Sequence, residues 1–216
     1  MPRLLDLFCG RWGWSRAFAA RGWECVGLDL VSPPEVPEGC RFMPMNILHL
    51  DEIPANFDFV VASSPCEQFS VHGMKHFHPN PPYPELGIKL FNHTRAVCEA
   101  SGLPYVMENV RAAQQFVGRA VHYCGPFYLW GTGVPPLMNQ GIKKGWGRKW
   151  IDSQGRVRDQ GPTGRAGGQW KEATNGTLTA MVATIPPELA NCVADYAERL
   201  LEQQAKIPLA SAEEKE

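Results

Sequence analysis

The sequence predicts an α/β protein built on a parallel sheet, and the first observation behind this lies at its start. An apolar run from Arg3 to Phe8 leads through a glycine-bearing turn into a helical pattern from Ser15 to Arg21. A second run, Gly22 to Asp29, follows a glycine and ends in a carboxylate. Strand, helix and strand in this order predict a βαβ unit, whose strands lie parallel.

Later apolar runs extend this sheet. Four further strands are expected, at Arg41 to Met45, Phe57 to Ala62, Tyr105 to Met107 and Phe127 to Trp130. Two longer segments carry apolar residues at helical spacing, Pro84 to Ser101 and Pro187 to Gln204, and regular structure is expected to resume at Leu178 to Ile185. Helices between and after the strands would cover both faces of the sheet.

Length and composition indicate a single domain. The 216 residues, 44% of them hydrophobic, can bury one sizeable core. We place that domain at residues 1–205 and expect residues 206–216, which are small and charged, to form a frayed tail. Glycine, proline, lysine, arginine and glutamine dominate residues 131–175, so this range is expected to be a short basic insert, and a loop of that length is usually functional or disordered.

Several protein classes are disfavoured by what the sequence lacks. Seven cysteines occur without a CxxC pair, which argues against a disulfide framework and a zinc finger. No secretion signal or membrane span is recognised, so a cytoplasmic protein is expected. Three histidines, His72, His76 and His78, lack a matching set of ligands, so we predict no metal. Their loop is expected either to close over a substrate or to be an ordinary surface loop.

Charge is distributed unevenly along the chain. The whole chain has a net charge of -1, whereas residues 141–171 contain eight Lys or Arg and two Asp, a net +6 (8 - 2). Trp146, Trp150 and Trp170 lie among these cations. Cations for phosphates and flat rings for bases favour nucleic acid as the partner, although a solvated loop would have the same composition.

Three motifs follow predicted strands. The turn after the first strand holds Gly10 and Gly13, with Asp29 at the end of the second strand; two glycines without a phosphate-binding Lys or Ser/Thr favour a nucleoside cofactor over a dinucleotide. Pro65 and Cys66 stand in a polar loop after the next strand, an unusual place for a core cysteine. Glu108 ends a further strand. If the last two strands share one sheet edge, thiol and acid face one pocket.

Taken in order, these stretches resemble the DNA cytosine-C5 methyltransferase family. DLFCGRWGW is similar to its cofactor-binding opening, SPCEQFS to its Pro-Cys nucleophile loop, MENV to its Glu-Asn-Val motif and ATIPPELANCV to its closing segment, over residues 4 to about 201. The resemblance implies a Rossmann-like S-adenosylmethionine-dependent methyltransferase sheet, S-adenosylmethionine as the cofactor, and a cytosine flipped out of DNA as the substrate.

The resemblance also implies roles for individual residues. Cys66 would add to C6 of cytosine, Glu108 would hold the N3 edge of the base, and Asn109 would brace the catalytic loop. Residues implied at the cofactor are Phe8, Gly10, Trp12, Gly13, Asp29, Leu30, Asn46, Ile47 and Pro65. Residues expected at the nucleic acid are Gln68, Ser70, Lys143, Lys144, Arg148, Lys149 and Arg165.

The sequence departs from the family's pattern at several positions. Trp12 stands where a glycine is usual, Asn46 where an Asp is usual, and Glu67 where a Gln is usual. The family's paired-arginine strand has no clear counterpart, and only Arg119 and His122 are candidates for its place. The alternatives left open are the same chemistry on RNA or a free cytosine nucleotide, a catalytically silent binding module, and an NAD-type oxidoreductase. The oligomeric state is not predicted.

Overall fold

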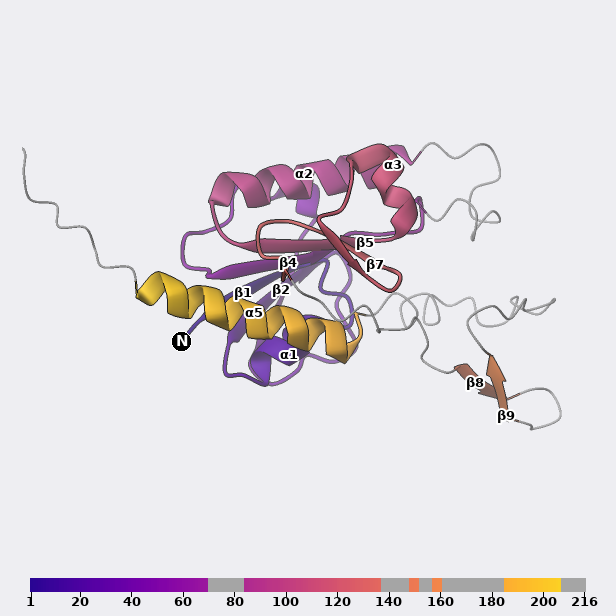
Figure 1. The fold of residues 1–216 in the computed structure, drawn as a ribbon, viewed down its shortest axis with the longest axis horizontal. Helices are drawn as coiled ribbons and strands as arrows, with labels where there is room; N and C mark the ends of the chain where they lie inside the picture. The colour runs from indigo at the N-terminus through magenta and orange to yellow at the C-terminus, as the bar shows by residue number, and fades with distance from the viewer. Residues whose placement is uncertain (70–83, 137–147, 152–156, 161–184, 207–216) are drawn as a thin grey trace, which may run out of the picture.

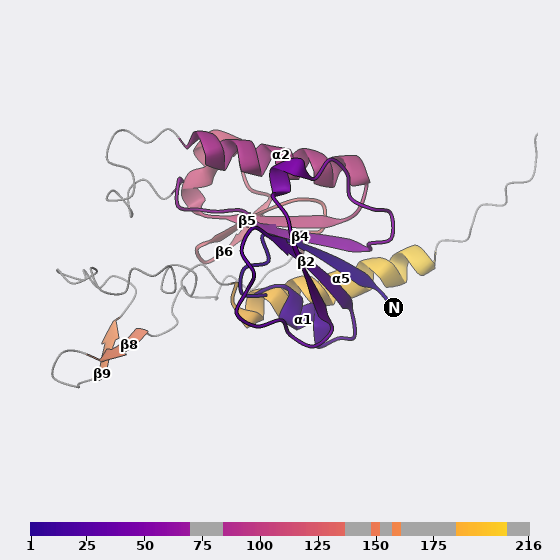
Figure 2. The same cartoon turned by 180° about the vertical axis from the view of Figure 1, so that it is seen from behind.

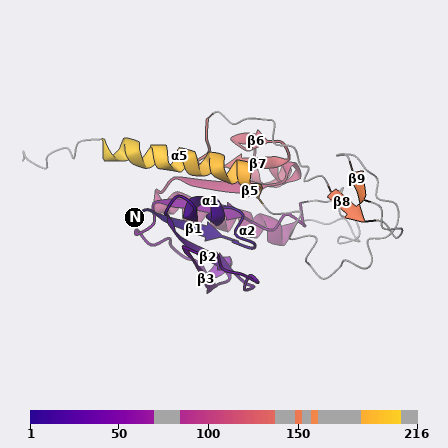
Figure 3. The same ribbon diagram turned by 90° about the horizontal axis from the view of Figure 1, so that it is seen from below.

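A seven-stranded sheet organises the protein. The computed structural model describes residues 1–69, 84–136, 148–151, 157–160 and 185–206. The strands of the sheet within these residues are β1 (Arg3–Leu7), β2 (Glu24–Asp29), β3 (Cys40–Pro44), β4 (Phe59–Ser63), β5 (Tyr105–Asn109), β6 (His122–Cys124) and β7 (Phe127–Trp130). Their spatial order is β3-β2-β1-β4-β5-β7-β6, and Figure 3 labels all of these strands except β4.

Only β7 runs against the other strands of this sheet. The pairs β1–β2, β2–β3, β1–β4 and β4–β5 are parallel, whereas β7 is antiparallel to both β5 and β6. This strand order with an antiparallel β7 is that of the class I, Rossmann-like methyltransferase fold. The predicted α/β class with this sheet is therefore confirmed.

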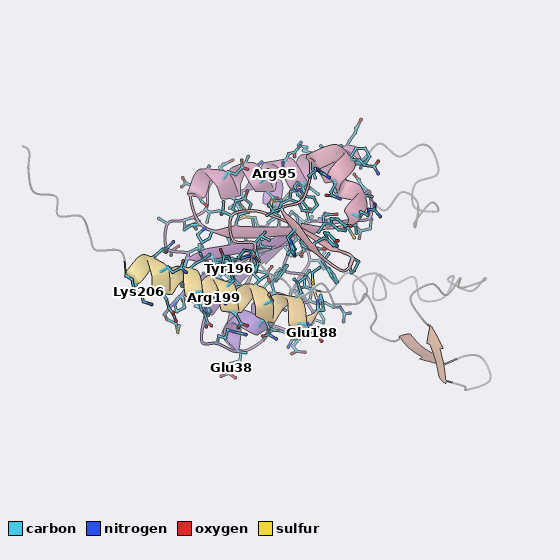
Figure 4. All side chains as sticks on the ribbon, viewed as in Figure 1. Glu38, Arg95, Glu188, Tyr196, Arg199 and Lys206 are labelled. Atoms are coloured by element: carbon cyan, nitrogen blue, oxygen red, sulfur yellow. The ribbon has the colours of Figure 1, made fainter. Side chains whose placement is uncertain are left out.

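Helices cover both faces of the sheet. Figure 1 shows α2 (Glu85–Ser101) and α3 (Gln114–Val117) above the sheet, with α1 (Ser15–Ala19) and α5 (Pro187–Ala205) below it. The side chains labelled in Figure 4 mark these two layers: Arg95 lies on α2, and Tyr196 and Arg199 lie on α5. None of the helices within the described residues is long and apolar enough to span a membrane.

Alternate residues of each strand point to opposite faces, so the sheet separates two cores. Leu4, Val61 and Val106 belong to the core on the side of α1 and α5, with Phe18 and Val193 from those helices. On the other side, residues of the same strands pack with α2, and they include Leu5, Val60, Met107 and Phe91. Burial on both faces explains why the central strands read as continuous apolar runs in the sequence.

The helix α5 is fixed to α1 by polar contacts as well as by apolar packing. Arg21, just after α1, donates from Nη1 to the Ala17 carbonyl oxygen at 2.7 Å and to Asn191 Oδ1 at 2.6 Å. Its Nη2 lies 2.5 Å from Asp195 Oδ1, and its Nε lies 3.8 Å from Glu198 Oε2. One half-buried guanidinium therefore holds both helices together on this face.

The predicted elements match those of the structure to within a few residues at their ends, with exceptions in the second half of the chain. Strand β6, helix α3 and the short 3-10 helices at Ile47–His49 and Arg111–Ala113 were not predicted. Within the range expected to be an insert, β8 (Arg148–Ile151) and β9 (Val157–Gln160) form an antiparallel pair, seen from the opposite side in Figure 2. Residues 178–184 of the predicted Leu178 to Ile185 segment, and the tail from residue 207, lie outside the described residues.

Candidate active site

The predicted nucleophile and acid lie at the same edge of the sheet. Ser63, the last residue of β4, is the register partner of Glu108 on β5, and Cys66 follows Ser63 by three residues. The Glu108 side chain is buried, Cys66 is half-buried and Pro65 is exposed. The carboxyl ends of parallel strands are where ligands bind in folds of this type.

Asn109 ties the Pro-Cys loop to β5. Its Nδ2 donates to the carbonyl oxygen and to Oγ of Ser64, each at 3.0 Å, and its Oδ1 accepts from the Val110 amide at 2.8 Å. Asn109 is fully buried and Ser64 is 4% exposed. Both side-chain groups of Asn109 are thus engaged, as a buried amide requires, and the residue before Pro65 is held in place.

Trp14 connects the first turn to the same edge. Its indole N–H donates to Ser63 Oγ at 2.9 Å, and the side chain is 2% exposed. Because Ser63 pairs with Glu108, this contact joins the turn after β1 to the strand end that carries the acid. Sequence reasoning did not single out Trp14, Ser63 or Ser64; the signal available was the pair of serines directly before Pro-Cys.

The turn after β1 has an unusual backbone. Phe8, Gly10 and Trp12 all have positive φ angles, of 63°, 47° and 63°. The amides of Phe8 and Cys9 both donate to the Leu28 carbonyl oxygen of β2, at 2.9 and 3.1 Å. A non-glycine residue in the left-handed region costs about 1–2 kcal/mol, so surrounding contacts must hold Phe8 and Trp12 in this conformation.

Trp12 keeps a backbone conformation that glycine favours, and its side chain lies in the core. The indole is fully buried against Gly27 of β2, where a Cβ would come within 2.3 Å of Trp12 Cζ3. Its N–H donates to the Glu35 carbonyl oxygen at 2.9 Å. Gly13, next along the chain, backs onto Ile185, where a Cβ would lie 2.9 Å from the Ile185 nitrogen. The tryptophan in the glycine-bearing turn is thus accommodated by a glycine on the neighbouring strand.

Asp29 closes this turn at the end of β2. Its Oδ2 accepts from the Gly10 amide at 3.0 Å, and its Oδ1 accepts from the Leu30 amide at 2.7 Å and from the Val31 amide at 3.4 Å. A carboxylate has about four acceptor sites and three are used here, so capacity for one ribose hydroxyl remains. Leu30 beside it is 69% exposed and offers an apolar surface to a base. These residues fit a nucleoside cofactor.

The remaining predicted cofactor residues follow β3. Asn46 is half-buried, and its Oδ1 accepts from the Leu48 amide at 3.1 Å, which caps the short helix Ile47–His49. Ile47 is 2% exposed and packs in the core on the α2 side. The Asn46 amide nitrogen remains the group of this pair that could donate to an adenine.

A buried carboxylate lies beneath the same turn. Asp6 of β1 is 1% exposed, and its Oδ2 accepts from the Ser15 hydroxyl at 2.5 Å. Burial raises the pKa of Asp6 to about 7, against the lowering effect of the hydrogen bonds from Ser15. Its Oδ1 is buried and has no hydrogen-bond partner among the described residues. Sequence reasoning did not identify this group, because a single carboxylate within an apolar strand pattern gives no sign of whether it is buried.

Of the residues predicted to contact nucleic acid, the structure describes the side chain of Gln68 alone. Gln68 Oε1 accepts from the Gly87 amide at 2.7 Å, which joins the loop carrying Cys66 to α2. Arg148 and Lys149 lie on β8. Ser70, Lys143, Lys144, Arg165 and the three histidines of the loop after Cys66 lie outside the described residues. In the part of the chain that the structure describes, no three His, Cys, Asp or Glu side chains are grouped as a metal site.

Comparison with known proteins adds distant similarities. No protein-family model matches the chain, and no curated protein matches it. Among solved structures it is similar to a prophage-encoded protein of E. coli described as a DNA modification methyltransferase, at 15% identity and a TM-score of 0.39. The alignment covers 53% of this chain and 34% of the E. coli chain. It is also similar to the 1,6-didemethyltoxoflavin-N1-methyltransferase of Burkholderia thailandensis, at 18% identity and a TM-score of 0.33. That alignment covers 61% of this chain and 55% of the other.

A methyltransferase of an antibiotic biosynthesis pathway from Anabaena variabilis aligns with 50% of this chain and 39% of its own, at 14% identity and a TM-score of 0.32. The chain thus spans between a third and just over half the length of these three structures. The assignment of the fold rests on the strand order and the antiparallel β7 described above.

Proposed function

We propose that this protein is an S-adenosylmethionine-dependent cytosine-C5 methyltransferase acting on DNA. The observation that carries the proposal is the register of β4 and β5, which brings the Pro65-Cys66 loop and Glu108 to one edge of the sheet. The turn after β1 and Asp29, which fit a nucleoside cofactor, lie at the ends of strands on the same sheet.

Cytosine C5 is too weak a nucleophile to accept a methyl group unaided. The Cys66 thiolate would form a bond from Sγ to C6, which moves electron density to C5. Glu108 would hold the N3 edge of the base and offset the charge that the ring gains. S-adenosylmethionine supplies the methyl group when bound. The C5 proton then leaves to a base and the Sγ–C6 bond breaks, which restores the aromatic ring and the thiolate.

The residues around this pair would serve its positioning. Asn109 holds the carbonyl and hydroxyl of Ser64, so that the loop carrying Cys66 approaches the substrate from a fixed point. Asp29 would orient the ribose of the cofactor at the end of β2, with Leu30 against its base. Because the C6 edge is stacked within a duplex, the target base must be flipped out or unpaired before Cys66 can reach it.

The test is methyl transfer from labelled S-adenosylmethionine to DNA, followed by hydrolysis to nucleosides and mass spectrometry. We expect 5-methylcytosine from the unaltered protein and none from Cys66→Ala, and Glu108→Gln should lower the rate by at least about 100-fold. Single-stranded RNA and free cytosine nucleotides serve as parallel substrates. Methylation of adenine N6 or cytosine N4, or an active Cys66→Ala protein, would contradict the proposal; transfer to RNA alone would keep the chemistry and change the substrate.

A further inference from the structure

Three aromatic rings form a ladder at the β6 edge of the sheet, and the proposed chemistry does not use them. His122 and Tyr123 of β6 are stacked with ring centroids 6.0 Å apart and planes at 25°. Tyr123 and Tyr128 of β7 are stacked at 5.4 Å and 17°. Parallel rings in contact are separated by about 3.5–4.0 Å, so these rings are displaced sideways and each leaves part of a face uncovered. Tyr123 is 45% exposed.

This aromatic ladder lies beside the candidate active site. Tyr128 is the register partner of Asn109, and Leu129 next to it pairs with Glu108 on one side and with His122 on the other. The ladder on β6 is therefore two strands from the acid, or about 10 Å at the usual strand spacing. Figure 3 shows β6 and β7 beyond β5 at this edge. Stacked bases are about 3.4 Å apart, so 10 Å corresponds to roughly two or three nucleotides.

Charge along the same part of the chain is of one sign. Residues 110–136, which hold β6 and β7, contain no Asp or Glu, and they contain two cationic side chains, Arg111 and Arg119. Arg111 and Arg119 are both exposed and lie in the segment between β5 and β6. An exposed aromatic face that follows two exposed cations in a segment without carboxylates is complementary to a nucleic-acid strand, whose bases stack and whose phosphates are negative.

We infer that the aromatic ladder is a stacking platform for an unpaired DNA base two or three nucleotides from the target cytosine, an inference that rests on the proposed function for its choice of substrate. Tyr123 is the central ring of the ladder and the most exposed of the three, and it would offer a base the part of its face that His122 and Tyr128 leave uncovered. Stacking tolerates any base, so the platform would hold an opened strand in register with Cys66 without selecting a sequence.

The test is the affinity of the full chain for a fluorescein-labelled single-stranded oligonucleotide with one cytosine, measured by fluorescence anisotropy without cofactor. Loss of one base–aromatic stack predicts a Kd increased by roughly 5- to 150-fold in Tyr123→Ala, whereas Tyr123→Trp should bind at least as well as the unaltered protein. The slope of log Kd against log salt concentration should stay the same, because no phosphate contact is removed. Val121→Ala, a change at a residue 66% exposed just before β6, is the matched control and should leave the Kd unchanged.

An abasic nucleotide moved along the oligonucleotide makes the test position-specific. Unaltered protein should lose affinity when the abasic nucleotide lies two or three positions from the cytosine, and Tyr123→Ala should be insensitive to it there. The inference would be overturned by an unchanged Kd in Tyr123→Ala or by an equal loss of affinity in Val121→Ala. It would also be overturned if analytical ultracentrifugation showed that Tyr123→Ala weakens self-association of the protein and leaves DNA binding unchanged. Tyr123-dependent binding by a protein that transfers no methyl group would refute the proposed function and leave the platform standing.

Discussion

Removal of the Asn109 side chain should loosen the loop that carries Cys66. In Asn109→Ala the Ser64 carbonyl and hydroxyl and the Val110 amide lose their partner, which removes three hydrogen bonds of 2.8–3.0 Å. A hydrogen bond contributes about 1 kcal/mol net, so the free energy of unfolding should fall by about 3 kcal/mol. That is a large part of the 5–15 kcal/mol typical of a domain.

Methyl transfer should fall further than stability explains. A displacement of about 1 Å at a reacting group costs roughly 100-fold in rate, so we expect a decrease of this order in kcat for Asn109→Ala at a temperature where the protein is still folded. Affinity for S-adenosylmethionine should change little, because the Asn109 side chain bonds to Ser64 and Val110, which lie outside the turn after β1. Urea unfolding, single-turnover methyl transfer and calorimetric cofactor binding measure the three quantities separately.

Two further variants make this prediction specific. Ser64→Ala removes only the hydroxyl acceptor and should cost about 1 kcal/mol, with little additional loss when combined with Asn109→Ala. Asn109→Asp keeps an acceptor for the Val110 amide and for the Ser64 hydroxyl, but it cannot donate to the Ser64 carbonyl oxygen and places a charge beside it, so its rate should fall toward that of Asn109→Ala. If Asn109→Ala left the unfolding free energy and kcat unchanged, or if the two changes were fully additive, the bracing role would be refuted.

Three other predictions concern the fold around the site. Gly27→Ala should lower the unfolding free energy by about 1–3 kcal/mol, because its Cβ would overlap the Trp12 indole and would also lie 2.8 Å from Cys9 Cβ. Urea unfolding should show a smaller penalty in a Trp12→Gly background, and a penalty of the same size there would contradict the packing. Arg21→Ala should lower the free energy of unfolding by about 1–2 kcal/mol through lost contacts between α1 and α5, and Arg21→Lys should recover only part of this loss. Equal stability of the two variants and the unaltered protein would show that Arg21 does not hold the two helices together. Burial raises the pKa of Asp6 in the folded state from 3.8 to about 7, so the folded state binds the proton more tightly than the unfolded state. The free energy of unfolding should therefore fall as pH rises from about 4 to 7. Urea unfolding as a function of pH should show that Asp6→Asn removes this dependence.

The sequence was sufficient for the fold class because strand and helix signals agree in its first 130 residues. Continuous apolar runs mark strands buried on both faces, and Val60 to Ala62 and Val106 to Met107 are such runs. Strand β6 escaped prediction because it has only three residues, two of them polar or half-exposed, and no periodicity can be read from so short a segment.

The sequence predicted which residues belong to the candidate site, but it did not predict the hydrogen bonds between them. Cys66 and Glu108 were named from their positions after strands, and register places their loops together. The contacts around them, from Asn109 to Ser64 and from Trp14 to Ser63, join residues 45 and 49 positions apart in the sequence, which no local pattern encodes. The fit of Trp12 likewise depends on Gly27, a residue on another strand.

The central claim is that Cys66 forms a covalent bond with cytosine C6. Replacement of the target cytosine by 5-fluorocytosine blocks loss of the C5 substituent, so the enzyme should remain bound to the DNA after methyl transfer. We predict a denaturation-resistant protein–DNA complex that requires S-adenosylmethionine, with the methylated base attached to the peptide containing Cys66 in mass spectrometry and no complex in Cys66→Ala. Methyl transfer to this DNA without a trapped complex, or a complex that persists in Cys66→Ala, would contradict the account.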